Sequence, residues 1–476
     1  MSSLRWSSRC RMRFMAHDNA TPARLGDSLI TLDPLDMRDR LASGAMRAAD
    51  LAAACIEQVK RREADVQAWA WLDEQHVMTQ AGRLDAQRKT GRPVGPLHGL
   101  PVALKDIIDT NGIPTENGTI IDKGRVPTED AVIVRKLKAA GAYVMGKTVT
   151  TELAYVAPGK TRNPVNPDHT PGGSSQGSAA AVGAAMVPLA IGTQTGGSVI
   201  RPAAYCGVVG FKPSFGMIPR TGILSQSPSL DTVGVFATSV AGVAMLADVL
   251  CGDDPADHAT TLSAPPRLLA TALSDVPVRP TLALMAHMPG DTAPSEDMAL
   301  AMQELSDILG EDVFALTLPI LFDEAAEIRE RINFAEMAKC YYAYERRGRQ
   351  QLSDITLAAI DAGKTVLARD YLAALDWPKL LNAALDEIFA RCDAIICPAT
   401  PTSAPAGLSS TGSAVYNGLW TLCGVPVVTL PLFEDSTGLP MGLQVVGRRG
   451  NDARLLRTAR WLTSELKKTS GVVTNV

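Results

Sequence analysis

Apolar residues follow two different periods along the chain, and the two periods alternate. From Asp36 to Arg62 they recur at three- to five-residue spacing, which is typical of helix. Further helices are expected near 77–89, from about 128 to 141, over SSQGSAAAVGAAM, over 241–250 and 295–309, and within 322–348 and 367–391. Short apolar runs predict strands over 102–104, 143–145, 187–191, 281–285 and 313–318, and in DAIICPATP and VPVVTLPL.

This alternation predicts the α/β fold class, with a mixed β-sheet core flanked by helices on both faces. Length alone suggests about three domains, although α/β folds also grow large as single units. The stretch 253–280 is rich in Asp, Ala and Pro and is the best candidate for a linker or insertion.

Composition excludes several classes of function. The net charge is −4 with no basic stripe, and aromatic residues make up only 5%, so neither nucleic acid nor a membrane is an expected partner. The eight cysteines are scattered without a C-x-x-C pair and away from the histidines. A zinc site and a disulfide framework are therefore not expected. The cysteine pattern instead favours a cytoplasmic location.

The first thirteen residues carry four arginines and lack the apolar stretch of a secretory signal. We expect residues 1–35 to be an N-terminal extension, disordered in part, with translation beginning at Met15 as one option for the native start. A transit peptide is the alternative interpretation of this Arg- and Ser-rich segment. No apolar run approaches the roughly 18 residues of a transmembrane helix.

Two familiar motifs occur in the wrong context. GAYVMGKT fits the phosphate-loop pattern, but it follows a helical pattern and its variable positions suit a buried strand. Lys147 is therefore expected to be an exposed lysine at a strand end. GSSQG fits the nucleophile elbow with Ser175 at its centre, but no strand precedes it, and only His258 and His287 lie downstream.

Lysine offers another base for a serine nucleophile, whose hydroxyl needs activation at neutral pH. A lysine amine can act as this base if burial lowers its pKa so that the amine is neutral. Lys105 directly follows the apolar run LPVAL, where a strand should end and partial desolvation is expected. An exposed strand-end lysine is the alternative.

Two glycine-rich turns complete the candidate chemistry. Gly172 and Gly173 precede Ser174 where a helix should begin, and an N-cap serine is the simpler interpretation there. The second turn, 195–198, has little side-chain bulk. Its successive N–H groups suit an oxyanion, while a surface loop is the alternative.

Together these stretches resemble the amidase signature family. The matching segments are GLPVALKD, NPVNPDHTPGGSSQGSAAAVGAA, LAIGTQTGGSVIRPAAYCGVVGFKPSFGMIPRTGI, SLDTVGVFA, CDAIICPATP, NGLWTLCGVPVVTLP and GLPMGLQVVGR. The resemblance runs from about residue 36 to 465 and is weakest over roughly 253–320. It implies the amidase signature fold, with one domain over 36–476.

The resemblance also implies a Ser–Ser–Lys triad. Ser198 aligns with the nucleophile, Ser174 with a bridging serine on a cis peptide bond, and Lys105 with the base. The N–H groups of the turn align with the oxyanion hole, which comprises Thr195, Gly196, Gly197 and Ser198. The reaction implied is hydrolysis of a C–N acyl bond in an amide, carbamate or urea-like compound through an acyl-enzyme, with neither metal nor organic cofactor.

Three positions depart from the commoner family pattern. Gln194 stands where aspartate is usual, Gln176 stands where glycine is usual, and Arg201 lies three residues after the nucleophile rather than two. This resembles a subgroup with the motif GTQTGGSVIRPA, similar to malonamidases. Gly172, Gly173 and Arg201 are candidates for substrate binding, and Arg201 could instead support the loop through carbonyl contacts.

The remaining alternatives concern substrate and assembly. An A-type subunit of a tRNA-dependent amidotransferase would share the fold and triad. A Ser175–His hydrolase would not need Lys105, and a non-enzymatic anion-binding module would keep its function in Ser198→Ala. Pocket walls are expected from 120–160, 253–350 and 405–420. Tyr155, Asn163 and Asp231 receive no role. The expected partner is a small-molecule amide or carbamate, and a homodimer is left open.

Overall fold

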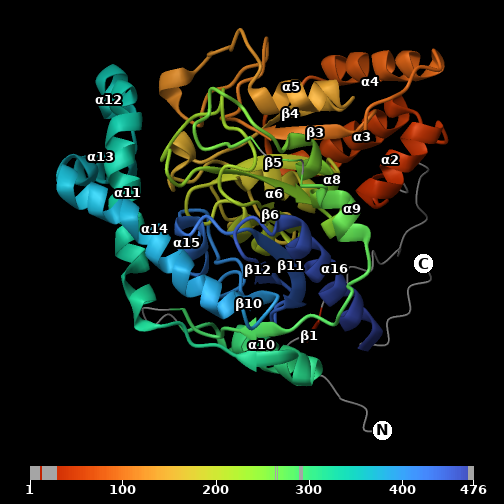
Figure 1. Ribbon diagram of the computed structural model, residues 1–476. Helices are drawn as coiled ribbons and strands as arrows, with labels where there is room; N and C mark the ends of the chain where they lie inside the picture. The colour runs from red at the N-terminus through yellow and green to blue at the C-terminus, as the bar shows by residue number, and fades with distance from the viewer. Residues whose placement is uncertain (1–10, 13–28, 263, 265, 289–292, 470–476) are drawn as a thin grey trace.

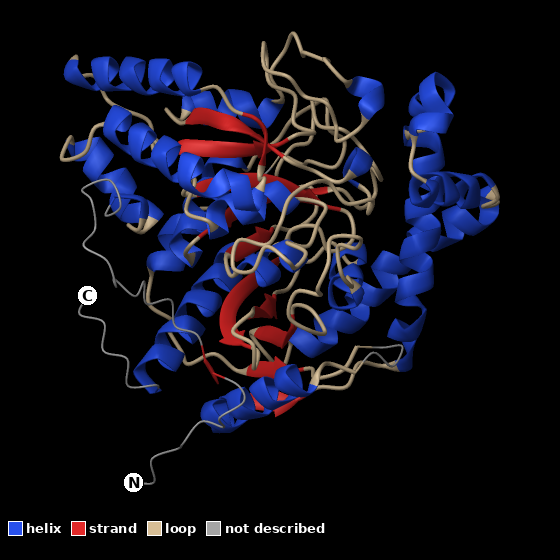
Figure 2. Ribbon diagram, turned by 180° about the vertical axis from the view of Figure 1, so that it is seen from behind, coloured by secondary structure: helices blue, strands red, loops and turns tan. Residues whose placement is uncertain are grey.

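The computed structural model describes residues 11–12, 29–262, 264, 266–288 and 293–469 (Figure 1). Within these ranges, one mixed sheet of 12 strands runs through the molecule in the order β2-β4-β3-β5-β7-β6-β11-β12-β10-β8-β9, with β1 beside β11. Helices surround the strands (Figure 2). The mixed α/β sheet predicted from the sequence is confirmed.

The strands are β1 (Arg11–Met12), β2 (Trp69–Trp71), β3 (Pro101–Lys105), β4 (Tyr143–Thr148), β5 (Leu189–Gln194), β6 (Val209–Lys212), β7 (Thr232–Ala237), β8 (Leu282–Leu284), β9 (Val313–Ala315), β10 (Ala394–Pro398), β11 (Val427–Glu434) and β12 (Pro440–Val446). Pairing is parallel for β3 with β4 and β5 and for β8 with β9 and β10, and antiparallel elsewhere. The parallel pairing of β3 with β5 brings their carboxyl ends to one edge.

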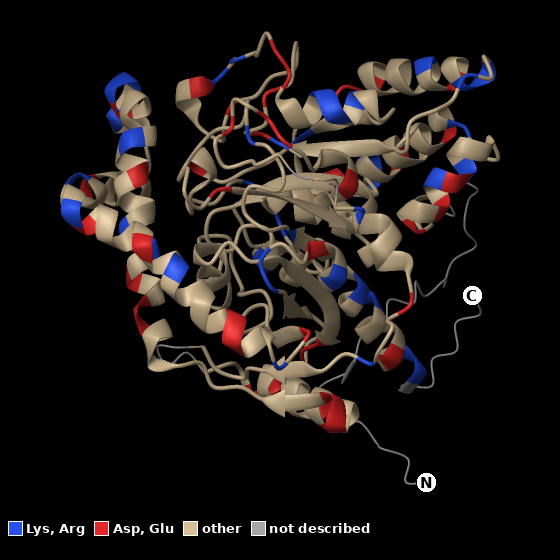
Figure 3. Cartoon of the chain, viewed as in Figure 1, with Lys and Arg blue, Asp and Glu red and all other residues tan. Residues whose placement is uncertain are grey.

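The helices are α2 (Pro34–Ser43), α3 (Ala48–Val66), α4 (Glu74–Lys89), α5 (Val132–Ala139), α6 (Gln176–Gly183), α7 (Ile200–Cys206), α8 (Val240–Leu250), α9 (Leu268–Leu273), α10 (Glu296–Leu309), α11 (Ala325–Cys340), α12 (Tyr342–Gly348), α13 (Asp354–Lys364), α14 (Ala368–Phe389), α15 (Val415–Leu422) and α16 (Asp452–Thr469). Acidic and basic residues lie close together on the outer helices (Figure 3), as where Arg349 bonds Asp361 at 2.5 Å.

The helical pattern over 36–62 is two helices rather than one. Gly44 ends α2 with φ of 81°, a left-handed conformation that glycine adopts without strain, and its N–H bonds the Leu41 carbonyl. The helix expected from about 128 begins only at Val132. The linker candidate 253–280 contains α9, which packs against α8 and α16.

The expectation that Lys147 is exposed is wrong. GAYVMGKT forms the buried strand β4, as its apolar positions predicted, but Lys147 is fully buried at its end. Its Nζ donates to the Ile108 carbonyl and the Thr115 hydroxyl, both at 2.6 Å, and lies 3.6 Å from Asp106. The loop after β3 covers the strand end, so the side chain has no path to water.

Small residues allow α6 to lie directly on the sheet. A Cβ at Gly177 would lie 2.4 Å from the Ala68 carbonyl oxygen, and one at Gly192 would lie 2.4 Å from Ser175 Oγ. Real Cβ atoms do not approach that closely, so glycine at both positions fixes the depth of α6 against β4 and β5. The start of α6, where Ser174 lies, is thereby held over the sheet edge.

Several predictions lie partly or wholly outside this description. Most of the N-terminal extension, including residues 1–10 and 13–28, is outside the described residues, so its order and the native start stay predictions. The seven cysteines in the described ranges are free thiols. Among helices that the structure describes, none is long and apolar enough to cross a membrane.

Candidate active site

Lys105 is the last residue of β3, and its ammonium or amine group is completely enclosed by protein. Its Nζ donates to the Ser174 hydroxyl at 2.7 Å and to the Thr193 hydroxyl at 2.9 Å. Thr193 lies near the end of β5, the neighbouring strand. The parallel alignment of β3 and β5 therefore places Lys105 beside Thr193, and the turn before α6 adds the Ser174 hydroxyl.

Burial lowers the pKa of Lys105 from 10.5 to about 7, and the nearby Asp231 carboxylate only partly opposes this change. The physical cause is desolvation, because the charged ammonium loses water and gains only neutral hydroxyl partners. A substantial fraction of Lys105 is therefore the neutral amine near neutral pH. A neutral amine is the form that accepts a proton from a serine hydroxyl.

Ser174 is not the helix cap suggested as the simpler alternative. Helix α6 begins at Gln176, two residues later, and Ser174 Oγ accepts the Lys105 hydrogen bond instead. The Gly173–Ser174 peptide bond is cis, as the family resemblance implied. The hydroxyl of Ser174 is thus directed at the lysine rather than at the helix end.

Ser175, the nucleophile of the Ser–His alternative, points elsewhere. Its hydroxyl donates to the Thr193 carbonyl at 3.1 Å and accepts from the Thr193 N–H at 3.2 Å. Ser175 is fully buried, whereas His258 and His287 are exposed. Neither histidine contributes to the hydrogen bonds of this serine, so the structure does not bring the Ser–His pair together.

The turn that carries Ser198 is held by side chains at both ends. Thr195 Oγ1 donates to Asp231 Oδ1 at 2.6 Å, and Asp231 Oδ2 accepts the N–H groups of Gln226 and Ser227, both at 2.9 Å. Ser198 itself is 8% exposed. Asp231 therefore anchors the start of the turn, a role that the sequence did not reveal.

Gln194 anchors the other side of the same turn. Its Oε1 accepts the N–H groups of Val199 and Ile200 at 2.9 and 3.0 Å, and its Nε2 donates to Thr421 Oγ1 at 3.0 Å. Thr421 in turn donates to the Gly196 carbonyl at 2.7 Å. The amide supplies both a donor and an acceptor, which the aspartate usual at this position could not do when ionised.

These contacts leave the donors of the turn free. The N–H groups of Thr195, Gly196, Gly197 and Ser198 donate to no acceptor within the described part of the chain. Such unpaired N–H groups on a rigid turn suit a developing oxyanion. The geometry is thus compatible with the oxyanion-hole assignment drawn from the sequence.

Arg201 makes the contacts of a bracing residue. Its Nη1 donates to the Gly412 carbonyl and its Nη2 to the Gly173 carbonyl, both at 2.7 Å. The side chain is buried and ties the 405–420 loop to the turn before Ser174. Two strong hydrogen bonds to protein carbonyls leave only Nε without a partner among the described residues.

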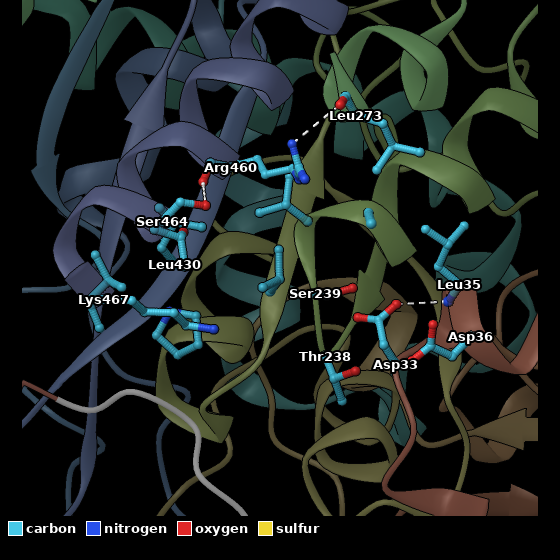
Figure 4. Close-up of a pocket in the computed structure, with 16 residues that line it drawn as sticks. Asp33, Leu35, Asp36, Thr238, Ser239, Leu273, Leu430, Arg460, Ser464 and Lys467 are labelled. Atoms are coloured by element: carbon cyan, nitrogen blue, oxygen red, sulfur yellow. Dashed lines mark hydrogen bonds between the residues drawn. The ribbon is translucent and has the colours of Figure 1, made fainter. Parts of the chain in front are cut away.

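A cavity of about 240 Å³ opens beside Ser198. Its lining includes the turn 195–198, Tyr155, Gln226, Arg329 and Asn333. A larger cavity of about 540 Å³ lies between α2 and α16 (Figure 4), where Asp33, Asp36, Arg460 and Lys467 are among the lining residues. It contains none of the candidate catalytic residues, so the smaller cavity is the candidate active site.

The family model described as Amidase matches residues 50–456. The chain belongs to the amidase family. It is an amidohydrolase that acts on C–N bonds, as the sequence predicted.

Proteins similar to this chain include an amidotransferase subunit and two hydrolases. The A-type subunit of glutamyl-tRNA(Gln) amidotransferase from Lachnospira eligens is 30% identical over 468 residues, covering 90% of this chain and 97% of the relative. The peptide amidase of Stenotrophomonas maltophilia is 27% identical with a TM-score of 0.78, covering 92% of this chain and 97% of that one. A 6-aminohexanoate cyclic dimer hydrolase is 26% identical with a TM-score of 0.80, covering 93% and 98%.

Within the described ranges of this amidase, no three His, Cys, Asp or Glu side chains gather where they could hold a metal ion. The site residues that sequence analysis missed are Thr193, Asp231 and Arg329. Asp231 lies in the stretch SLDTVGVFA, whose resemblance to the family could have indicated a role for this residue. Arg329 lies on α11, within a region expected to form pocket walls but with no motif to identify the inward face.

Proposed function

We propose that this chain hydrolyses a linear C–N acyl bond through Lys105, Ser174 and an acyl-enzyme on Ser198. The observation that carries the proposal is the 2.7 Å contact between Ser174 Oγ and the Nζ of a lysine that is fully buried. Burial favours the neutral amine, so Lys105 suits a base rather than a surface charge.

In the proposed mechanism, Lys105 takes the Ser174 proton while Ser174 takes the Ser198 proton, so Ser198 attacks the substrate carbonyl. The N–H groups of the turn stabilise the oxyanion of the tetrahedral intermediate, which collapses as the C–N bond breaks. The proton returns through Ser174 to the leaving nitrogen. Water then attacks the acyl-enzyme with the same relay, releasing the acid and restoring Ser198.

Substrates of this reaction are amides, with carbamates and urea-like compounds as chemically related candidates. The cavity offers Gln226 Oε1, a buried acceptor without a partner among the described residues, for a substrate N–H. Gln226 Nε2 is fixed by Asn333 at 2.9 Å, which holds this acceptor in place. A small-molecule substrate fits a cavity of about 240 Å³.

The test is a release assay with aliphatic amides, aryl anilides, malonamate-like amides and aryl carbamates. Wild type is compared with Ser198→Ala, for which we expect a loss of turnover on the order of 10³-fold or more. Ser175→Ala is the matched control, because it removes a neighbouring hydroxyl from outside the relay. If no compound is cleaved in a Ser198-dependent way, the proposal fails.

A second candidate is the A-type component of a tRNA-dependent amidotransferase. It is favoured by the similarity to the A-type subunit of glutamyl-tRNA(Gln) amidotransferase over 97% of that relative. This candidate requires a partner that co-purifies with the chain and activity that depends on charged tRNA. Turnover of simple amides by the purified chain alone, without partner or tRNA, favours the independent amidase.

A further inference from the structure

Arg329 on α11 places its guanidinium group against the turn that precedes Ser198. A Cβ built on Gly196 would lie 3.5 Å from Arg329 Nη1, and one on Gly418 would lie 2.8 Å from Nε. The guanidinium thus packs between the proposed oxyanion turn and α15. Glycine at position 418 provides the space for this approach.

The donors of this guanidinium are uncommitted. Within the described residues, Arg329 makes no hydrogen bond, and its ion pair is with Glu330 at 3.6 Å, whose side chain is 55% exposed. Arg201, the other arginine that lines this cavity, has two carbonyl partners at 2.7 Å. The Arg329 side chain is only 19% exposed, and this partial burial lowers its pKa, although arginine stays charged.

Arg329 also lies where two cavities meet. It lines the cavity of about 240 Å³ that contains Ser198 and a second one of about 300 Å³ whose apolar wall includes Met288, Phe322 and Leu419. The cavity beside Ser198 therefore reaches Arg329. This is the only guanidinium in the described lining of the Ser198 cavity without a hydrogen bond to protein.

We propose that Arg329 binds a carboxylate on the acyl portion of the substrate, so that the preferred substrates are monoamides of short dicarboxylic acids. This rests on the proposed function for the bond that is cleaved. The planar guanidinium matches a carboxylate with two parallel hydrogen bonds. Its position beside Gly196 places the carboxylate only a few bonds from the reacting carbonyl, and the substrate replaces the long contact to Glu330.

The experiment compares substrate pairs of matched shape. Succinamate and glutaramate carry the carboxylate, whereas butanamide and pentanamide replace it with a methyl group. In wild type, the anionic member of each pair should have the higher kcat/KM. Arg329→Gln should reduce this preference by about 10- to 100-fold, as expected for a charged hydrogen-bonding partner, because kcat/KM falls much further for the anionic amides than for the neutral ones.

Arg331→Gln is the matched control, because it removes the same charge from the same helix. Arg331 bonds Glu327 at 2.5 Å, outside the lining of either cavity. This variant should keep the wild-type preference, and Arg329→Lys should restore part of it. An equal fall for anionic and neutral amides with Arg329→Gln, or an unchanged preference, overturns the proposal.

A binding measurement separates this proposal from the proposed function. Succinate and glutarate are titrated calorimetrically into Ser198→Ala, with and without Arg329→Gln. Affinity that falls about 10-fold or more with Arg329→Gln supports carboxylate binding even if no amide is hydrolysed. Equal affinity in the two proteins refutes it, even if Ser198-dependent hydrolysis is found.

Discussion

Replacing Lys105 by methionine tests whether the buried lysine is neutral in the folded protein. Methionine keeps an unbranched side chain of similar length but cannot carry a charge. Hydrolysis should fall on the order of 10³-fold or more if Lys105 is the base. The free energy of unfolding should also change, and the pH dependence of this change reports whether Lys105 is protonated in the folded protein.

The magnitude follows from the pKa. Burial lowers the pKa of Lys105 from 10.5 to about 7, and at ~1.4 kcal/mol per tenfold change this corresponds to about 5 kcal/mol. Between these values the unfolded chain keeps the proton that the folded protein has released. Stability therefore rises with pH across this window and falls as pH drops toward 7. From pH ~7 to ~10 the gain specific to Lys105 is about 3–4 kcal/mol.

Denaturant unfolding at several pH values measures this difference. Wild type and Lys105→Met are compared at each pH, because the buried Lys147 and Lys212, whose pKa values are also lowered, contribute equally to both proteins. The free energy of unfolding of wild type should rise by the stated amount relative to the variant. Parallel curves would mean that Lys105 stays protonated in the folded state, and the neutral-base mechanism would be refuted.

The remaining predictions concern the turn. Gly197→Ala should reduce hydrolysis strongly, because its Cβ would lie 2.5 Å from Asn417 Oδ1. Gly196→Ala is the comparison, because the nearest atom to its Cβ would be 3.5 Å away. Equal thermal stability of Gly197→Ala and Gly196→Ala would contradict this steric account. Gln194→Ala should destabilise the protein by about 2–4 kcal/mol, because the buried amides of Val199 and its successor lose their acceptor. Denaturant unfolding measures it, and a change below about 0.5 kcal/mol would show that the turn holds itself.

The sheet and most of its elements could be predicted because apolar runs and helical spacing record burial directly. The strand β4 was identified even though its sequence imitates a phosphate loop, since its variable positions are apolar. Strands β1, β2, β6, β7 and β12 were not expected. The first three have only two to four residues, and glycine interrupts the apolar residues of β6, β7 and β12, so none of the five gives a continuous apolar run.

Side-chain environments were harder to predict than elements. Lys147 was expected at the surface because it ends a strand, but Thr115 and the rest of the following loop cover it. The distinction depends on a loop path that no local pattern encodes. Arg329 raises the same difficulty, because α11 carries several charged positions and only packing against Gly196 and Gly418 shows that Arg329 faces the site.

Helix α11 carries Arg329, Asn333 and Glu336 at intervals of four and three residues, which one helical face presents together. Asn333 accepts from Gln226, and Glu336 accepts from the Ser229 hydroxyl at 2.5 Å. The proposed reacting groups belong instead to β3 and to the turns before α6 and α7. Under these two proposals, substrate recognition and reaction chemistry are encoded on separate parts of the chain. Substitutions on this helical face should then change which substrates are accepted while leaving the proposed reacting groups in place.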